Sequence, residues 1–197
     1  MATLRCGMKI IERNVARRTV IEAYVHYDCL KKQLQVPNFD EWDWSNADVI
    51  DERLDLAHLK VGIPAGYIQH WEKTTITMAD LRGCAVDGGI FPQHPRPLGL
   101  IESAGGLGAW RPDRKANWYE PIVSGQTLGE TAPLILRPAV ACERPASWYI
   151  EDGSGRAIAF VANQLRFDAH AVLAIGYLGR EPDRHSSFMQ RHFRELL

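Results

Sequence analysis

The sequence has no run of about 18 apolar residues and no basic segment followed by an apolar one near its start. A membrane-spanning helix needs the first pattern, and a secretory signal peptide needs the second. We therefore expect neither. The chain also has no internal repeat and no low-complexity segment, which argues against a repeat architecture.

Cysteine is scarce, and its positions (Cys6, Cys29, Cys84 and Cys142) include no C-x-x-C pair. Zinc sites built from thiolates normally use such pairs, so the spacing argues against one. Scattered cysteines are typical of a protein whose thiols stay reduced. We expect a cytoplasmic protein. A position at the inner membrane would require binding to a partner there.

Net charge is small, at −1, and does not indicate a nucleic-acid-binding protein. The charges are nevertheless unevenly distributed. Residues 1–32 carry seven Lys or Arg against three acids, whereas residues 38–60 carry seven acids against two bases. This pattern fits a surface for a polyanion, but it equally fits an ordinary solvated exterior, which is the commoner case.

The chain has 197 residues, 46% of them apolar, which suits one domain or a domain with an extension. Residues 20–27 fit either a strand or a helix. Residues 83–112 are dense in glycine and proline and predict a long irregular segment. Elsewhere we expect strands over 67–76, 133–136, 148–151 and 171–177, and helices over 47–59, 78–81, 118–124, from 156 onward and over 186–196.

The segment from Asp152 to Arg156 reads Asp-Gly-Ser-Gly-Arg and joins an expected strand to an expected helix. Gly153 and Gly155 permit a positive φ and let a ligand approach the backbone closely. Amides at a helix start attract anions, and Arg156 adds a fork of donors. The pattern predicts a phosphate-binding turn. The alternative is an ordinary strand-to-helix turn in which Asp152 caps the helix.

The order of the expected elements over residues 66–180 resembles the ParB/sulfiredoxin superfamily. A proline-apolar strand at 133–136 precedes a strand, a Gly-x-x-Arg turn and a helix, and the turn corresponds to Gly153–Arg156. The resemblance implies an α+β fold, with a small mixed sheet and helices over residues 66–197. Residues 1–65 would form an N-terminal accessory region packed on that core.

This chain departs from two branches of the superfamily. Ser154 stands where sulfiredoxins have their catalytic cysteine, so reduction of sulfinic acids is not expected. Partition proteins carry an acid or Asn there and a second basic residue beside the arginine, whereas this chain has Ser154 and Gly155. We also expect no helix-turn-helix after the core. The chain better resembles the small plasmid fertility inhibition factors.

Resemblance to the fertility inhibition factors implies a protein that blocks conjugative or T-DNA-type transfer. The implied activities are nucleotide hydrolysis (ATPase) and DNA cleavage (DNase). The implied cofactors are ATP, or another nucleoside triphosphate, and Mg²⁺. The implied partners are DNA, bound without sequence preference, and a type IV secretion coupling protein. Two alternatives stay open: a non-catalytic module that binds the coupling protein, and a DNA-associated partition or regulatory factor.

The candidate site residues follow from this motif. Asp152, Gly153, Ser154, Gly155 and Arg156 would cradle the phosphates, with Arg156 also stabilising charge during the reaction.

Hydrolysis also needs a metal ion or a general base. Glu120 and Glu130, which flank the helix expected to cover the site, are the candidate acids, although each could be a surface charge. The Asp168-x-His170 pair could bind an ion or form a loop salt bridge. Trp110 and Trp118 could stack a base or anchor a loop.

Overall fold

The computed structural model describes residues 8–46, 49–50, 52–53, 68–86, 97–109, 118–139 and 143–182. Within the helix expected over 47–59, residues 49–50 and 52–53 are helical. The helix expected over 186–196 lies outside the described residues, as do Trp110, Cys6 and Cys142.

A six-stranded mixed sheet forms the centre of the structure, with strand order β1-β2-β6-β4-β5-β3. Its strands are β1 (Lys9–Val15), β2 (Ile68–Ile76), β3 (Cys84–Ala85), β4 (Gly129–Pro138), β5 (Trp148–Asp152) and β6 (Ala174–Pro182). β4 runs parallel to β6, and β3 runs parallel to β5, whereas the other neighbours are antiparallel.

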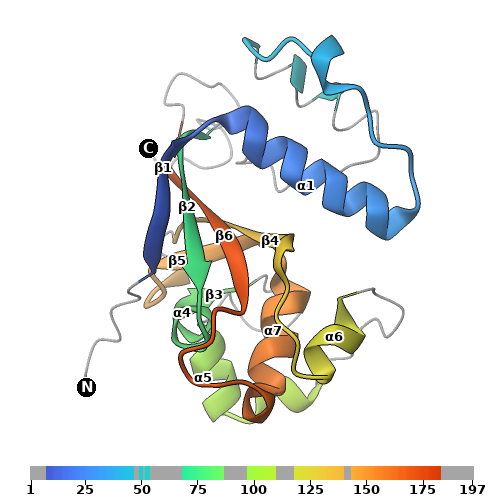
Figure 1. The fold of residues 1–197 in the computed structure, drawn as a ribbon. Coiled ribbons are helices and arrows are strands. Elements are labelled where there is room, and N and C mark those ends of the chain that lie inside the picture. The colour runs from blue at the N-terminus through green and yellow to red at the C-terminus, as the bar shows by residue number, and fades with distance from the viewer. Residues whose placement is uncertain are drawn as a thin grey trace.

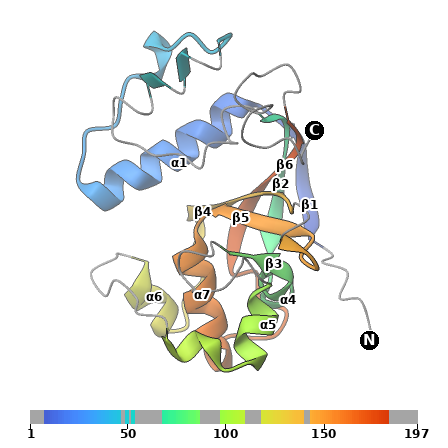
Figure 2. The ribbon, with the colours of Figure 1, turned by 180° about the vertical axis from the view of Figure 1, so that it is seen from behind.

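Helices lie on both sides of this sheet, and Figures 1 and 2 show α1 apart from the others. The helices are α1 (Arg17–Lys32), α4 (Met78–Gly83), α5 (Leu98–Ser103), α6 (Tyr119–Val123) and α7 (Ser154–Ala162). Short 3₁₀ helices are η1 (Phe39–Glu41), η2 (Gly106–Ala109) and η4 (Gln164–Arg166). The expected α+β fold is confirmed.

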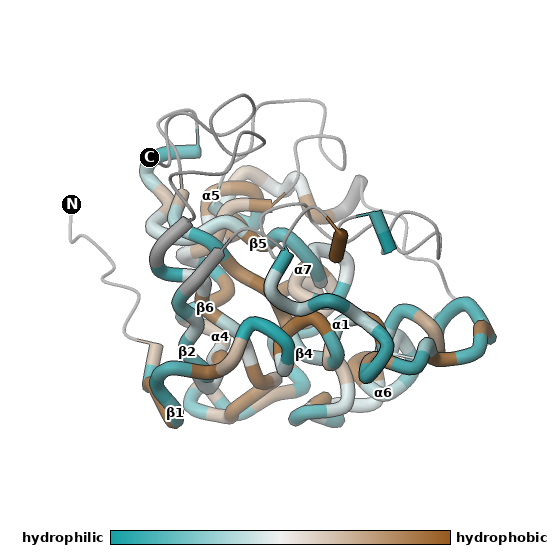
Figure 3. Tube along the Cα trace, turned by 90° about the horizontal axis from the view of Figure 1, so that it is seen from above, coloured by the Kyte–Doolittle hydropathy of each residue, from teal (hydrophilic) through white to brown (hydrophobic). Residues whose placement is uncertain are grey.

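Residues 20–27, which the pattern left open between strand and helix, belong to α1. Val20, Ile21, Tyr24 and Val25 are buried at helical spacing. Hydrophilic and hydrophobic positions alternate in short stretches along this helix (Figure 3). The N-terminal part of the chain is therefore folded onto the sheet through an amphipathic helix.

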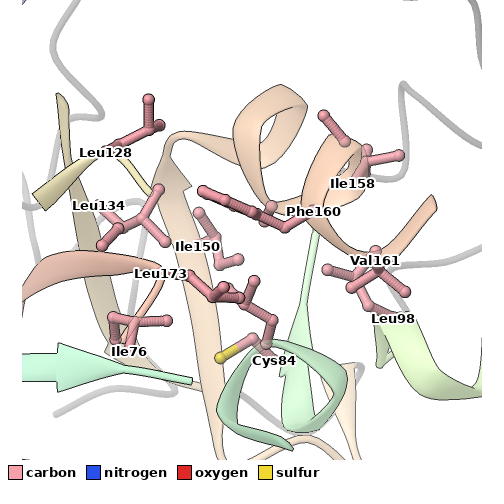
Figure 4. Close-up of a cluster of buried hydrophobic side chains, with 14 of the residues drawn as sticks. Ile76, Cys84, Leu98, Leu128, Leu134, Ile150, Ile158, Phe160, Val161 and Leu173 are labelled. Atoms are coloured by element: carbon pink, nitrogen blue, oxygen red, sulfur yellow. The ribbon is translucent and has the colours of Figure 1, made fainter. Parts of the chain in front are cut away.

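The alternation of side chains along β4 divides the interior into two cores. Leu134 and Leu136 face one core, which contains Phe160 of α7 (Figure 4). Ile135, between them, faces the other core, which contains Trp71 of β2 and the buried face of α1. Successive strand residues point to opposite faces, so a strand covered on both sides is apolar throughout.

The first strand of the chain joins the sheet directly. β1 pairs antiparallel with β2, with Lys9 opposite Thr75 and Val15 opposite Trp71. The buried hydroxyl of Thr74 donates to the Lys9 carbonyl at 2.8 Å. Residues 9–15 thus extend the same sheet as the segment after residue 66, although the sequence places them in the accessory region.

The expectation of a long irregular segment over 83–112 is wrong in part, since this range contains β3, α5 and η2. Several other expected elements differ at their ends. β4 starts at Gly129 rather than at 133, and β6 runs from Ala174 to Pro182 rather than over 171–177. α7 begins at Ser154, two residues before the expected start. Among the described residues, no helix has both the length and the apolar character that crossing a membrane requires.

We predict that Phe160→Ala destabilises the fold by about 3–5 kcal/mol, because it removes a fully buried ring from the core beneath α7. Urea unfolding followed by circular dichroism measures the change. Leu165→Ala is the control: this side chain is 96% exposed, so its loss should cost less than about 0.5 kcal/mol. Similar losses in both variants would contradict the packing described here.

Candidate functional site

The turn between β5 and α7 is built around Gly153, which alone separates the two elements. Its φ is 100°, in the left-handed region that glycine enters at low cost. A Cβ atom here would also overlap Leu134 Cδ2. Gly155 instead lies inside the first turn of α7 and is not among the described glycines with positive φ. A positive φ was expected at both glycines, and of the two only Gly153 has one.

The start of α7 has no side-chain cap. The alternative in which Asp152 caps the helix is wrong, because the Asp152 carboxylate forms an ion pair with Arg156, four residues on. Ser154 Oγ donates to the Ile150 carbonyl at 3.3 Å. Amides in the first turn of a helix carry partial positive charge and attract anions. These backbone donors are therefore available to an anionic ligand.

Arg156 is buried, with 2% of its surface exposed. Its Nη1 donates to the Pro133 carbonyl at 2.9 Å, and its Nη2 donates to Asp152 Oδ2. The guanidinium also lies 4.1 Å from the ring centroid of Tyr27 on α1. Arg156 therefore joins β4, the turn and α1, and two of its nitrogens already have protein partners.

A second buried arginine, Arg137, forms an ion pair with Glu151, the acid that precedes Asp152 in β5. Arg137 on β4 donates to both carboxylate oxygens of Glu143 at 2.7 Å and also pairs with Glu151. Its guanidinium lies 4.1 Å from the Tyr149 ring centroid. Burial lowers the pKa of Arg137, but the two carboxylates outweigh burial and raise it above its ordinary value. Arg137 thus stays charged and fixes Glu151 beside the turn.

A hollow of about 390 Å³ opens above this turn. Three segments that are distant in sequence supply its walls: α1, the residue before α6, and the end of β5 with the turn and the start of α7. The lining residues are Tyr27, Lys31, Trp118, Tyr149, Glu151, Asp152, Gly153, Ser154, Gly155 and Arg156. The hollow therefore combines three aromatic rings, a lysine and a helix start.

The five residues expected to cradle phosphate (152–156) all line this hollow. Glu120 and Glu130, expected as acids, are not among its described lining residues. Glu120 is exposed on α6, directly after the lining segment at Trp118. Glu130 is exposed on β4, and its Oε1 lies 2.6 Å from Lys73 Nζ. Their catalytic roles stay predictions.

Sequence reasoning missed Tyr27, Lys31 and Tyr149. Tyr27 and Lys31 are four residues apart, which places them on one face of a helix. That signal was hidden because residues 20–27 fitted a strand as well as a helix. Tyr149 alternates with the buried Ile150 in β5, so its direction toward the hollow follows from the period of a strand.

A second hollow, of about 420 Å³, lies beside Arg82, Asp168 and His170. Here Asp168 Oδ1 accepts a hydrogen bond from the backbone amide of His170 at 2.8 Å, which is a local turn interaction. Arg82 is held by Glu102 in a two-pronged pair. Within the described ranges, no group of three or more His, Cys, Asp or Glu side chains is arranged to hold a metal ion.

We predict that Gly153→Ala destabilises the protein by more than the strain of its φ alone, which costs about 1–3 kcal/mol. The added methyl group would overlap Leu134 as well. Gly105→Ala is the control, because Gly105 has a φ of 71° and no heavy atom within 4 Å of an added Cβ. Urea unfolding measures both variants, and equal losses would exclude the close packing at Gly153.

Comparison of the chain with family models, with curated proteins and with solved structures finds no match in any of the three.

Proposed function

We propose that this protein binds a nucleoside triphosphate in the hollow above the Gly153 turn and acts as a plasmid fertility inhibition factor. The observation that carries the proposal is the convergence of the α7 start, Lys31 and three aromatic rings on one hollow. A phosphate chain needs hydrogen-bond donors and positive charge, whereas a base needs a flat apolar surface. The hollow offers both.

The donor side of the hollow consists of backbone and one lysine. The first turn of α7 has no side-chain cap, and Gly153 brings the backbone close to a ligand. Lys31 lines the same hollow from α1. Arg156 contributes chiefly by fixing the turn, since Asp152 and the Pro133 carbonyl occupy two of its nitrogens.

The aromatic side consists of Tyr27, Trp118 and Tyr149. Tyr27 is covered by the Arg156 guanidinium, and Tyr149 by that of Arg137, each at 4.1 Å. A guanidinium on a ring holds it by cation–π attraction and so fixes its orientation. Tyr149, which is only partly buried, is a ring fixed in this way and is suited to stack a nucleobase without losing much side-chain entropy on binding.

Hydrolysis and DNA cleavage belong to the proposal through the resemblance. Mg²⁺ would neutralise the phosphates, and Glu120 or Glu130 would position water. The second candidate function is a non-catalytic module that binds a type IV secretion coupling protein. The pairing of Glu151 with Arg137, and of Asp152 with Arg156, favours this candidate, because both acids lining the hollow already serve as ion-pair partners.

We predict that Lys31→Ala weakens ATP binding about tenfold, because it removes a charged donor from the hollow. Isothermal titration calorimetry with and without Mg²⁺ measures the affinity, and phosphate release measures turnover. Lys9→Ala is the matched control: it removes the same charge from β1, at the opposite edge of the sheet from β5 and β3. No ATP binding by the wild type would refute the nucleotide proposal.

The fertility inhibition proposal has a separate test, which is the frequency of conjugative plasmid transfer from cells that express each variant. We expect the wild type and Lys9→Ala to reduce transfer, and Lys31→Ala to lose this effect. If Lys31→Ala binds no ATP yet still inhibits transfer, the non-catalytic module is the correct function. If the wild type leaves transfer unchanged, both forms of the inhibition proposal fail.

A further inference from the structure

Tyr27 lines the hollow, and its hydroxyl is buried without a hydrogen-bond partner among the described residues. Tyr27 as a whole is 7% exposed. Burying a polar group without a partner costs about 1–3 kcal/mol, so nearly all buried hydroxyls in proteins are paired. An unpaired hydroxyl on a residue that lines a hollow is a candidate contact for a ligand.

The surroundings of Tyr27 keep its hydroxyl protonated. Burial raises the pKa of Tyr27; the charge of Arg156 opposes this rise, and those of Asp152 and Asp28 add to it. The effects of Arg156 and Asp152 on this pKa indicate that the Tyr27 hydroxyl lies close to their ion pair at the turn. A protonated phenol at this position is a hydrogen-bond donor with no acceptor among the described residues.

One turn further along α1, Lys31 lines the hollow as well. Its neighbour Lys32 has a partner, since Lys32 Nζ lies 2.6 Å from Asp28 Oδ2. No such ion pair is recorded for Lys31 among the described residues. Tyr27 and Lys31 are four residues apart, so α1 presents a phenol and an ammonium group on one face.

We propose that Tyr27 and Lys31 form a phosphate-binding arm, in which the hydroxyl and the ammonium group of α1 donate to a phosphoryl oxygen held at the start of α7. This inference rests on the proposed function and names the residues that recognise the nucleotide. It gives α1, which lies outside the segment that resembles the superfamily, a direct role in binding.

The hydrogen-bond donors and paired acids that line the hollow favour an oxyanion as the ligand over a cation. Tyr27, Lys31 and the first amides of α7 are all donors. The acids in the lining, Glu151 and Asp152, are each paired with an arginine. Among the described residues that line the hollow, Lys31 is the one charged side chain with no ion pair, and the partial positive charge of the helix start adds to its charge. A phosphate group matches this set of donors.

Tyr27→Phe is the decisive variant, because it removes the hydroxyl and keeps the ring beneath Arg156. We predict that affinity for ATP and for pyrophosphate falls about 10- to 100-fold, as expected for loss of a hydrogen bond to a charged group. The melting temperature without ligand should stay the same or rise, since an unpaired buried hydroxyl is lost. Titration calorimetry and thermal unfolding measure the two effects.

Tyr177→Phe is the matched control. Tyr177 is also 7% exposed, but it lies on β6 in the core that contains Trp71. Affinity for both probes should be unchanged in this variant. The double variant Tyr27→Phe with Lys31→Met adds a further test, because two groups that contact one phosphate should give non-additive losses.

The outcomes separate this inference from the proposed function. If ATP binds the wild type and Tyr27→Phe equally well, the arm does not exist, although nucleotide binding stands. If pyrophosphate binding depends on Tyr27 but ATP does not bind, the arm stands and the nucleotide proposal fails. If neither probe binds the wild type, both are overturned.

Discussion

The buried guanidinium of Arg156 is the interaction on which the site depends. It joins the Pro133 carbonyl on β4, the Asp152 carboxylate at the end of β5 and the Tyr27 ring on α1. A charge removed from water must be compensated by partners in fixed positions. The planar guanidinium can donate along its edges while its flat face lies on a ring, and the tetrahedral ammonium group of a lysine has no such face. Three separate segments thereby take up defined positions around the turn.

The balance of charge in the hollow follows from this arrangement. Arg156 neutralises Asp152, and Arg137 neutralises Glu151 while it also binds Glu143. Because Asp152 and Glu151 are each paired with an arginine, their negative charges repel an anion less than unpaired carboxylates would. Their main effect is to hold the surrounding segments in place. Hydrolysis would therefore draw its acid from beyond the turn, and the exposed Glu120 on α6 follows closely after the lining residue Trp118.

Local patterns in the sequence predicted the turn and the strands around it, because glycine spacing and apolar runs are local signals. The α+β class was implied by the resemblance. The buried state of Arg156 was not predictable, since an arginine beside two glycines reads equally well as a ligand contact or an ion-pair partner. The role of α1 was hidden for a different reason. Whether Tyr27 faces the hollow depends on how a helix docks on the sheet more than 100 residues away in sequence, and periodicity carries no such information.

The position of β6 has a consequence for how the protein is made. β6 lies between β2 and β4 at the centre of the sheet, yet it is the last strand of the described chain to leave the ribosome. Until residues 174–182 emerge, β2 and β4 each lack a central neighbour, and the pairings that unite the two halves of the sheet cannot form. Synthesis proceeds at roughly 5–20 residues per second, so the nascent chain spends several seconds with unpaired strand edges. The complete sheet therefore forms late in translation, and a product that ends before residue 174 would contain the Gly153 turn without the central strand of the sheet.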